Sequence, residues 1–167
     1  MDNKQLKEQI IEQLGLIPLT KEGGMVLSTY RSEEMYEDRN VGSAIYYLLT
    51  GEAYSHLHML SADEMWHHYL GDSVEMIAID DKTGELKKSI LGKDILNGER
   101  PQVLAAKNTW QGARMQPGDY GFALMGTTMS PGFKENDFIL GTREAMLEKF
   151  PQHEADIANF TGELIYN

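Results

Sequence analysis

The chain has 167 residues, of which 41% are hydrophobic and 25% are charged, as in a soluble globular protein, and its length favours one domain over residues 1–167. The absence of cysteine excludes disulfides, thiolate nucleophiles and cysteine-based zinc sites. A formal net charge of -11, with no cluster of basic residues, argues against nucleic acids and anionic membranes as partners.

The first predicted element is a helix that ends at Gly15. Its apolar stripe repeats at helical spacing and consists of Leu6, Ile10, Ile11 and Leu14. Asn3 can cap the start, and Gly15 suits a left-handed exit. This charged segment differs from a secretory signal, and no apolar run approaches the ~20 residues of a membrane span. We therefore expect a cytoplasmic protein.

The middle of the chain predicts an antiparallel β-sandwich or barrel. Short runs rich in β-branched and aromatic residues alternate with glycine-containing turns, with no helical pattern between them. The predicted strands cover residues 25–30, 43–50, 53–60, 65–70, 73–80, 101–106 and 120–129. Helical spacing returns at residues 143–150 and 153–160, with Pro151 as the break between them. Sandwiches of this kind commonly hold a ligand between their sheets, near one open end.

Four of the five histidines lie between Ser55 and Asp72, in the stretch SHLHMLSADEMWHHYLGD. Alternation along a strand predicts that His56 and His58 share a face, and Glu64 on the next strand can join them. Two imidazoles and a carboxylate suit Zn, Mn, Fe or Ni. The same groups can act without metal, with histidine as a general base and the carboxylate fixing its tautomer. A chance cluster of surface histidines is the competing interpretation.

These residues resemble the first motif of the cupin superfamily. Its glycine, paired histidines, glutamate and second glycine are matched by Gly51, His56, His58, Glu64 and Gly71. More narrowly, segments along nearly the whole chain resemble an uncharacterised branch called cupin family 5. Among them are EGGMVLSTYRS, SADEMWHHYLGD, GERPQVLAAKNTWQGAR and SPGFKENDF.

The resemblance implies a mainly β, jelly-roll barrel with an internal pocket, a short N-terminal helix and C-terminal helices, paired as a homodimer. Metal-dependent oxygenases, isomerases and lyases, metal-free epimerases and sensor domains share this fold, so it fixes no reaction. The metal ligands it implies are His56, His58 and Glu64, with Gln111 where the second motif normally supplies a histidine. Because glutamine is a weaker ligand than imidazole, the resemblance leaves open whether one divalent metal is bound or none.

Several further side chains are candidates for contacting a substrate. Trp66 and Trp110 can form apolar walls, although aromatic residues in a barrel more often belong to the core. Arg114 can hold a carboxylate or phosphate, or else pair with one of the many acidic residues. Tyr30 can reach the mouth or the dimer interface, and His68 shares the predicted face of Glu64 and Trp66.

Three functions remain open from the sequence. The first is an enzyme acting on a small polar metabolite such as a sugar or hydroxy acid, of the isomerase or epimerase type or metal-dependent. In that case His58, Glu64 and His56 carry the catalysis while Gln111 or Arg114 orients the substrate. The second is a non-enzymatic binding or sensor module. The third is a structural dimer in which the histidines are ordinary polar strand residues.

Overall fold

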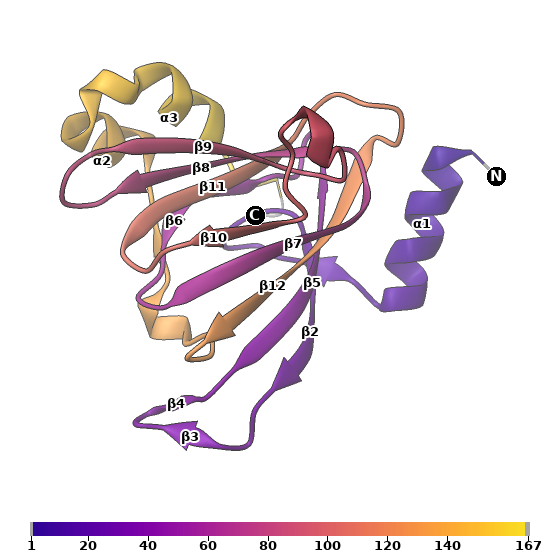
Figure 1. Cartoon of the computed structure of the whole chain (residues 1–167), viewed down its shortest axis with the longest axis horizontal. Helices are drawn as coiled ribbons and strands as arrows, with labels where there is room; N and C mark the ends of the chain where they lie inside the picture. The colour runs from indigo at the N-terminus through magenta and orange to yellow at the C-terminus, as the bar shows by residue number, and fades with distance from the viewer. Residues whose placement is uncertain (1, 166–167) are drawn as a thin grey trace.

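Two antiparallel sheets face each other in the computed structural model, which describes residues 2–165 (Figure 1). The six-stranded sheet runs, in spatial order, β1 (Ile17–Pro18), β2 (Met25–Arg31), β5 (Ser43–Thr50), β12 (Phe122–Ser130), β7 (Asp63–Gly71) and β10 (Gln102–Ala105). The five-stranded sheet runs β13 (Ile139–Leu140), β6 (Ser55–Met59), β11 (Thr109–Met115), β8 (Val74–Asp80) and β9 (Leu86–Leu91). A small hairpin pairs β3 (Met35–Tyr36) with β4 (Arg39–Asn40).

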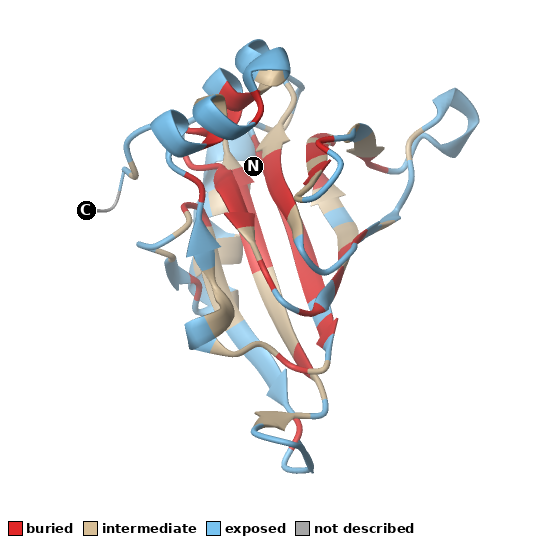
Figure 2. Cartoon of the chain, turned by 90° about the vertical axis from the view of Figure 1, so that its left-hand side faces the viewer, coloured by how far each residue is buried: buried red, intermediate tan, exposed pale blue. Residues whose placement is uncertain are grey.

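The main core fills the space between the two sheets, where the buried strand segments run through the centre of the molecule (Figure 2). Inward-facing residues alternate along the strands that supply this core, as expected for two packed sheets. Both sheets contribute: Tyr47, Leu49, Trp66, Ala123 and Met125 come from one, and Val74, Met76, Leu91 and Ala113 from the other. The prediction of a mainly β sandwich or barrel is therefore confirmed.

The N-terminal helix α1 (Asn3–Leu14) forms as predicted and ends at Gly15 in the left-handed conformation, with φ 66°. Its apolar stripe packs beside Leu48, Phe122 and Leu124 on the outer face of the six-stranded sheet. The predicted cap at Asn3 is wrong by one residue. Asp2 is the cap: its side chain accepts from the Gln5 backbone N–H at 2.8 Å, and the Gln5 side chain accepts from the Asp2 N–H at 3.2 Å. This reciprocal pair satisfies two otherwise free donors.

The C-terminal helices cover the outer face of the five-stranded sheet (Figure 1). They are α2 (Arg143–Lys149) and α3 (Glu154–Phe160), joined by the 3-10 turn η3 (Pro151–His153). Met146, Ile157 and Phe160 pack on Leu57 and Ile77 of the sheet beneath. Two further 3-10 turns are η1 (Ile95–Asn97) and η2 (Glu135–Asp137). Within residues 2–165, every helix is too short or too polar to cross a membrane.

Two long strands have no counterpart in the sequence prediction. β9 carries the exposed lysines Lys87 and Lys88, so it lacks a continuous apolar run. β11 contains Gly112, a residue that normally weakens a strand. Here an added side-chain carbon would lie 3.0 Å from the Phe160 ring of α3, a tight contact. The absence of a side chain at Gly112 thus lets the C-terminal helix pack closely on the sheet.

Candidate functional site

Seven polar or amphipathic side chains meet between the sheets, and we call them the interior polar cluster. They come from the turn before β2 and from β5, β6, β7 and β11. All are buried or nearly so, and hydrogen bonds or close charge contacts connect them into two groups. The members are Glu22, Tyr47, Ser55, His58, Glu64, Trp66 and Gln111.

The first group orients the carboxyl of Glu64. The Trp66 indole N–H donates to Gln111 Oε1 at 2.9 Å, and Gln111 Nε2 donates to Glu64 Oε2 at 2.7 Å. Because an indole nitrogen can only donate, it fixes which end of the glutamine amide faces which partner. Trp66 therefore determines, through Gln111, that a donor is presented to Glu64.

The second group holds His58. The ring nitrogen Nδ1 lies 2.8 Å from the backbone carbonyl of His56, and 3.8 Å from Glu22 Oε1. Because a carbonyl oxygen only accepts, Nδ1 must carry the hydrogen. The neutral ring then has an unshared electron pair on Nε2. The Phe138 ring stacks on this imidazole at a centroid separation of 5.2 Å, so the histidine has an aromatic wall on one face.

Glu22 is a member of the cluster that the sequence did not reveal. The Tyr47 hydroxyl lies 2.9 Å from its Oε1, and the Ser55 hydroxyl donates to the same oxygen. The turn that carries Glu22 needs glycine next to it: Gly23 has φ 107°, and a side chain there would collide with the Tyr54 carbonyl. The EGG motif predicts this tight turn but not where its glutamate points, because Ser55 is 33 residues away along the chain.

Burial shifts the acid–base behaviour of this cluster. Desolvation raises the pKa of Glu64, and the nearby Glu22 raises it further, whereas His58 and hydrogen bonds from Thr127 and Gln111 lower it. Desolvation also raises the pKa of Tyr47 well above its ordinary range, with Glu22 adding to the effect. A carboxyl group that resists ionisation and a nearby imidazole are a pair of groups suited to opposite roles in proton transfer.

His56 does not join His58, contrary to the alternation expected from the sequence. Gln111 pairs with His58 and Ala113 pairs with Ser55, so two residues of β6, His56 and Leu57, lie opposite the single Gly112. This irregularity is a β-bulge, and it interrupts the alternation of side chains. The His56 ring stacks on Tyr54 at 4.1 Å and lines a separate cavity described below.

The other predicted contact residues lie outside the cluster. Trp110 packs under the C-terminal helices, and its N–H donates to Asp81 at 2.7 Å. Arg114 lies over the Tyr54 ring and donates to the Asn159 carbonyl at 2.5 Å. Tyr30 is 56% exposed on β2. His68 is half-buried and bonded through Nε2 to the Asp72 carbonyl at 3.0 Å.

The predicted metal ligands do not fit a metal ion in this arrangement. Within residues 2–165, no group of three or more histidine, aspartate or glutamate side chains is close enough together to hold one. His56 lines a separate cavity and does not lie beside His58, and the Gln111 carbonyl oxygen already accepts the Trp66 N–H. His58 and Glu64 remain near each other, but they supply too few free donors for the ion and ligand number expected.

Comparisons with known proteins agree with the sheet architecture. Residues 8–141 match the family described as Cupin superfamily (DUF985). A crystal structure from Shewanella oneidensis is similar with 39% identity, covering 93% of this chain and 97% of that one at a TM-score of 0.87. A hypothetical protein from Leishmania major has 29% identity, covering 93% and 98% at a TM-score of 0.87.

More distant similarity concerns the fold alone. A variant of Bacillus subtilis oxalate decarboxylase has 16% identity, covering 87% of this chain and 37% of that one at a TM-score of 0.55. A comparison with curated proteins gave no match. With two facing antiparallel sheets, buried polar side chains between them and a family match over residues 8–141, this chain has the cupin fold and belongs to the Cupin superfamily (DUF985) family.

Proposed function

We propose that the protein binds a small polar metabolite, a sugar or a hydroxy acid, beside the interior polar cluster and catalyses a proton transfer on it. The reaction class is isomerisation or epimerisation. The proposal rests on how hydrogen bonds hold two neighbouring side chains, a histidine and a glutamate. His58 has its Nδ1 hydrogen directed at the His56 carbonyl, and Glu64 is a buried carboxyl held by Gln111.

In this mechanism His58 is the base. Its unprotonated Nε2 removes a proton from a substrate carbon next to a carbonyl group, and the electron pair of that C–H bond moves into an enol. Glu64 in its protonated form donates its proton to the carbonyl oxygen as the enediol forms. In the second step the His58 imidazolium returns a proton to carbon and the Glu64 carboxylate takes a proton from an enediol hydroxyl, so both groups are restored. Glu22 lies 3.8 Å from the Nδ1 side of His58 and stabilises the imidazolium that forms. No net oxidation occurs and no metal is required.

The test is hydrogen exchange from carbon. Aldoses, ketoses and 2-hydroxy acids are incubated with the protein in D2O, and proton NMR follows the loss of carbon-bound proton signals. We expect exchange in one of these classes, and a His58→Gln protein at least about 100-fold slower, as for loss of a general base. His67→Gln is the matched control, because His67 lies on the opposite face of β7 with its ring bonded to Thr128 and Gln102. Exchange at the wild-type rate in His58→Gln would reject the assignment.

A binding or sensor module is the second candidate, and one feature favours it. Gln111 has both ends of its amide engaged by Trp66 and Glu64, and Glu22 is engaged by Tyr47 and Ser55. Groups that satisfy one another in this way rigidify the surrounding structure without taking part in a reaction. A rise in melting temperature with one of the same compounds, without carbon-bound exchange, would establish this function instead.

A further inference from the structure

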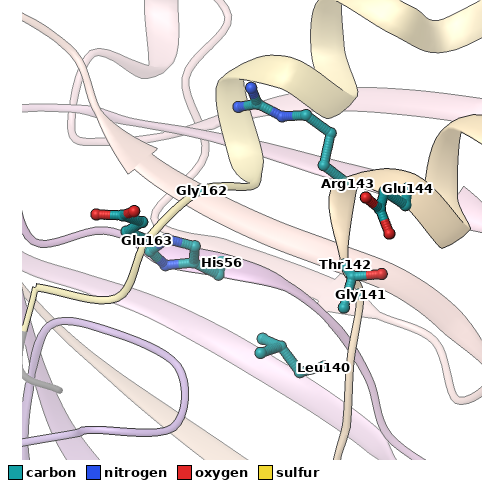
Figure 3. A pocket seen from close by; sticks show the side chains of 8 residues that line it. All are labelled: His56, Leu140, Gly141, Thr142, Arg143, Glu144, Gly162 and Glu163. Carbon is teal, nitrogen blue, oxygen red and sulfur yellow. The ribbon is translucent and has the colours of Figure 1, made fainter.

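A cavity of about 340 Å³ lies outside the interior polar cluster, and we call it the C-terminal cavity (Figure 3). It opens between the first part of β6, the junction of β13 with α2, and the segment that follows α3. Its volume falls within the range of small-molecule pockets. The polar side chains that line it are His56, Thr142, Arg143, Glu144 and Glu163.

His56 lines this cavity and has one ring nitrogen without a hydrogen-bond partner. Its side chain is 3% exposed. The ring nitrogen Nδ1 lies 2.8 Å from the Glu22 carbonyl and 3.2 Å from the Tyr54 carbonyl, so Nδ1 carries the hydrogen. The opposite nitrogen, Nε2, is buried and has no hydrogen-bond partner. Leaving a buried polar atom unpaired is unfavourable, and a ligand with a suitable donor would offset this cost.

The imidazole is held in place before any ligand arrives. It stacks on the Tyr54 ring at 4.1 Å with an angle of 17° between the planes. The guanidinium of Arg114 covers the Tyr54 ring at 3.9 Å. The two hydrogen-bonded carbonyls fix the remaining rotation of the imidazole. A positioned acceptor binds with a smaller entropic cost than a mobile one.

The charges around the cavity favour a cation. Glu144 and Glu163 are exposed and line the cavity together with His56 (Figure 3). Arg143, the basic residue of the lining, is committed elsewhere: it donates to the Thr161 hydroxyl at 3.1 Å and to the Ala158 and Thr161 carbonyls at 2.8 and 2.7 Å. The net charge of -11 adds a long-range attraction for cations.

We propose that the C-terminal cavity binds a small organic ammonium ion that donates a hydrogen bond to His56 Nε2. Glu144 and Glu163 balance its charge at the rim. An ammonium group supplies N–H donors for the Nε2 atom of His56 and for the carboxylates, all of which act as acceptors here. A phosphate or carboxylate ligand would meet the two negative charges of Glu144 and Glu163 against the single positive charge of Arg143. A metal ion is disfavoured because, within residues 2–165, no set of three ionisable ligands is close enough together to hold one.

The probe is 1,4-diaminobutane, and its neutral analogue of similar length is 1,4-butanediol. Isothermal titration calorimetry of the full chain at low ionic strength should show saturable binding of the diamine and at least about tenfold weaker binding of the diol. His56→Phe keeps a ring that can stack on Tyr54 but removes Nε2, and it should weaken diamine binding at least about tenfold, as for loss of one charge-assisted hydrogen bond. Circular dichroism checks that this variant is folded.

Three further variants keep the test decisive if His56→Phe fails to fold. Glu163→Gln removes one rim carboxylate and should weaken diamine binding about threefold. Glu148→Gln removes an exposed carboxylate from α2 that does not line the cavity, and it should bind as wild type does. Glu64→Gln alters the interior polar cluster and should also leave diamine affinity unchanged.

Four results would overturn the proposal. One is the absence of saturable heat with the diamine, and another is equal affinity for the diamine and the diol. The third is a folded His56→Phe protein with wild-type affinity. The fourth is equal weakening by Glu163→Gln and Glu148→Gln, which would show only a general attraction to the acidic surface.

Discussion

The interior polar cluster and the C-terminal cavity each contain one histidine of the same H-x-H pair, and the surroundings of the two histidines differ. In both, Nδ1 is held by a backbone carbonyl and the unshared pair sits on Nε2. His58 lies among carboxyl, hydroxyl and amide groups that bond with one another. His56 faces a cavity with its Nε2 unpaired. The H-x-H motif therefore predicts which side chains are present, but it does not predict which region of the structure each one faces.

The physical cause of the difference is the bulge in β6 opposite Gly112. One extra residue in a strand moves the side chains on either side of it out of simple alternation. Ser55 and His58 both end up inside the barrel, and His56 is moved to the edge beside the C-terminal segment. The comparison predicts that changes inside the barrel cost much more folding free energy than changes near the cavity.

The largest expected effect comes from Gln111→Met. The new side chain has a similar length but leaves the Trp66 N–H and the Glu64 carboxyl without their partners. Each unpaired buried group costs about 1–3 kcal/mol, so we expect a loss of about 3 kcal/mol in the free energy of unfolding, measured by urea denaturation. Gln13→Met, the same change on the exposed side of α1, should stay within about 0.5 kcal/mol of wild type. Equal losses at both positions would show that the amide network is not stabilising.

The second-largest expected effect is a change in the free energy of unfolding with pH, caused by Glu64. Because burial raises its pKa above the ordinary value of 4.5, the folded protein keeps this proton at pH values where the unfolded chain has released it. The stability that Glu64 contributes is therefore fully present below its unfolded pKa, and it is lost as pH rises through its folded pKa. The loss is about 1.4 kcal/mol for each unit by which the pKa is raised.

The measurement compares wild type with Glu64→Gln by urea denaturation over a series of pH values. The stability advantage of wild type over this variant should decrease as the pH rises above the ordinary pKa of glutamate. A difference between wild type and the exposed Glu148→Gln variant should remain nearly constant over the same range. If the stability difference between wild type and Glu64→Gln is constant or increases with pH, the result would contradict a raised pKa of Glu64.

Much of the fold could be predicted from the sequence because it depends on local patterns. β5 covers residues 43–50, as expected from its apolar and aromatic run, and the stripe of α1 packs on the sheet. Pro151 separates the two C-terminal helices, as its missing N–H predicts. β9 and β11 were missed because pairing with neighbouring strands stabilises them, despite the exposed lysines of β9 and the glycine of β11.

The site was less predictable, because it depends on contacts between distant segments. The sequence singled out His58, Glu64, Trp66 and Gln111, and the structure brings all four into the interior polar cluster; their roles there stay predictions. Glu22 joins through a turn whose direction no local pattern specifies. Arg114 and Trp110 share β11 with Gln111, yet they lie on its other face, toward the C-terminal helices. Strand parity separates these residues, but only once the strand itself is known.

The smallest expected effect tests the stack that holds His56. Arg114→Lys keeps the charge but loses the planar group that covers Tyr54 and the N–H directed at the Asn159 carbonyl. We expect a loss of about 0.5–1 kcal/mol in the free energy of unfolding, typical of a partly exposed cation–π contact. Arg100→Lys is the control, because within residues 2–165 its guanidinium covers no aromatic ring, and it should stay within about 0.5 kcal/mol of wild type. Because Arg114 supports only the stack beside the C-terminal cavity, the exchange of carbon-bound substrate protons should continue at the wild-type rate. A slowed exchange would mean that the two regions are coupled through β6, which carries both histidines.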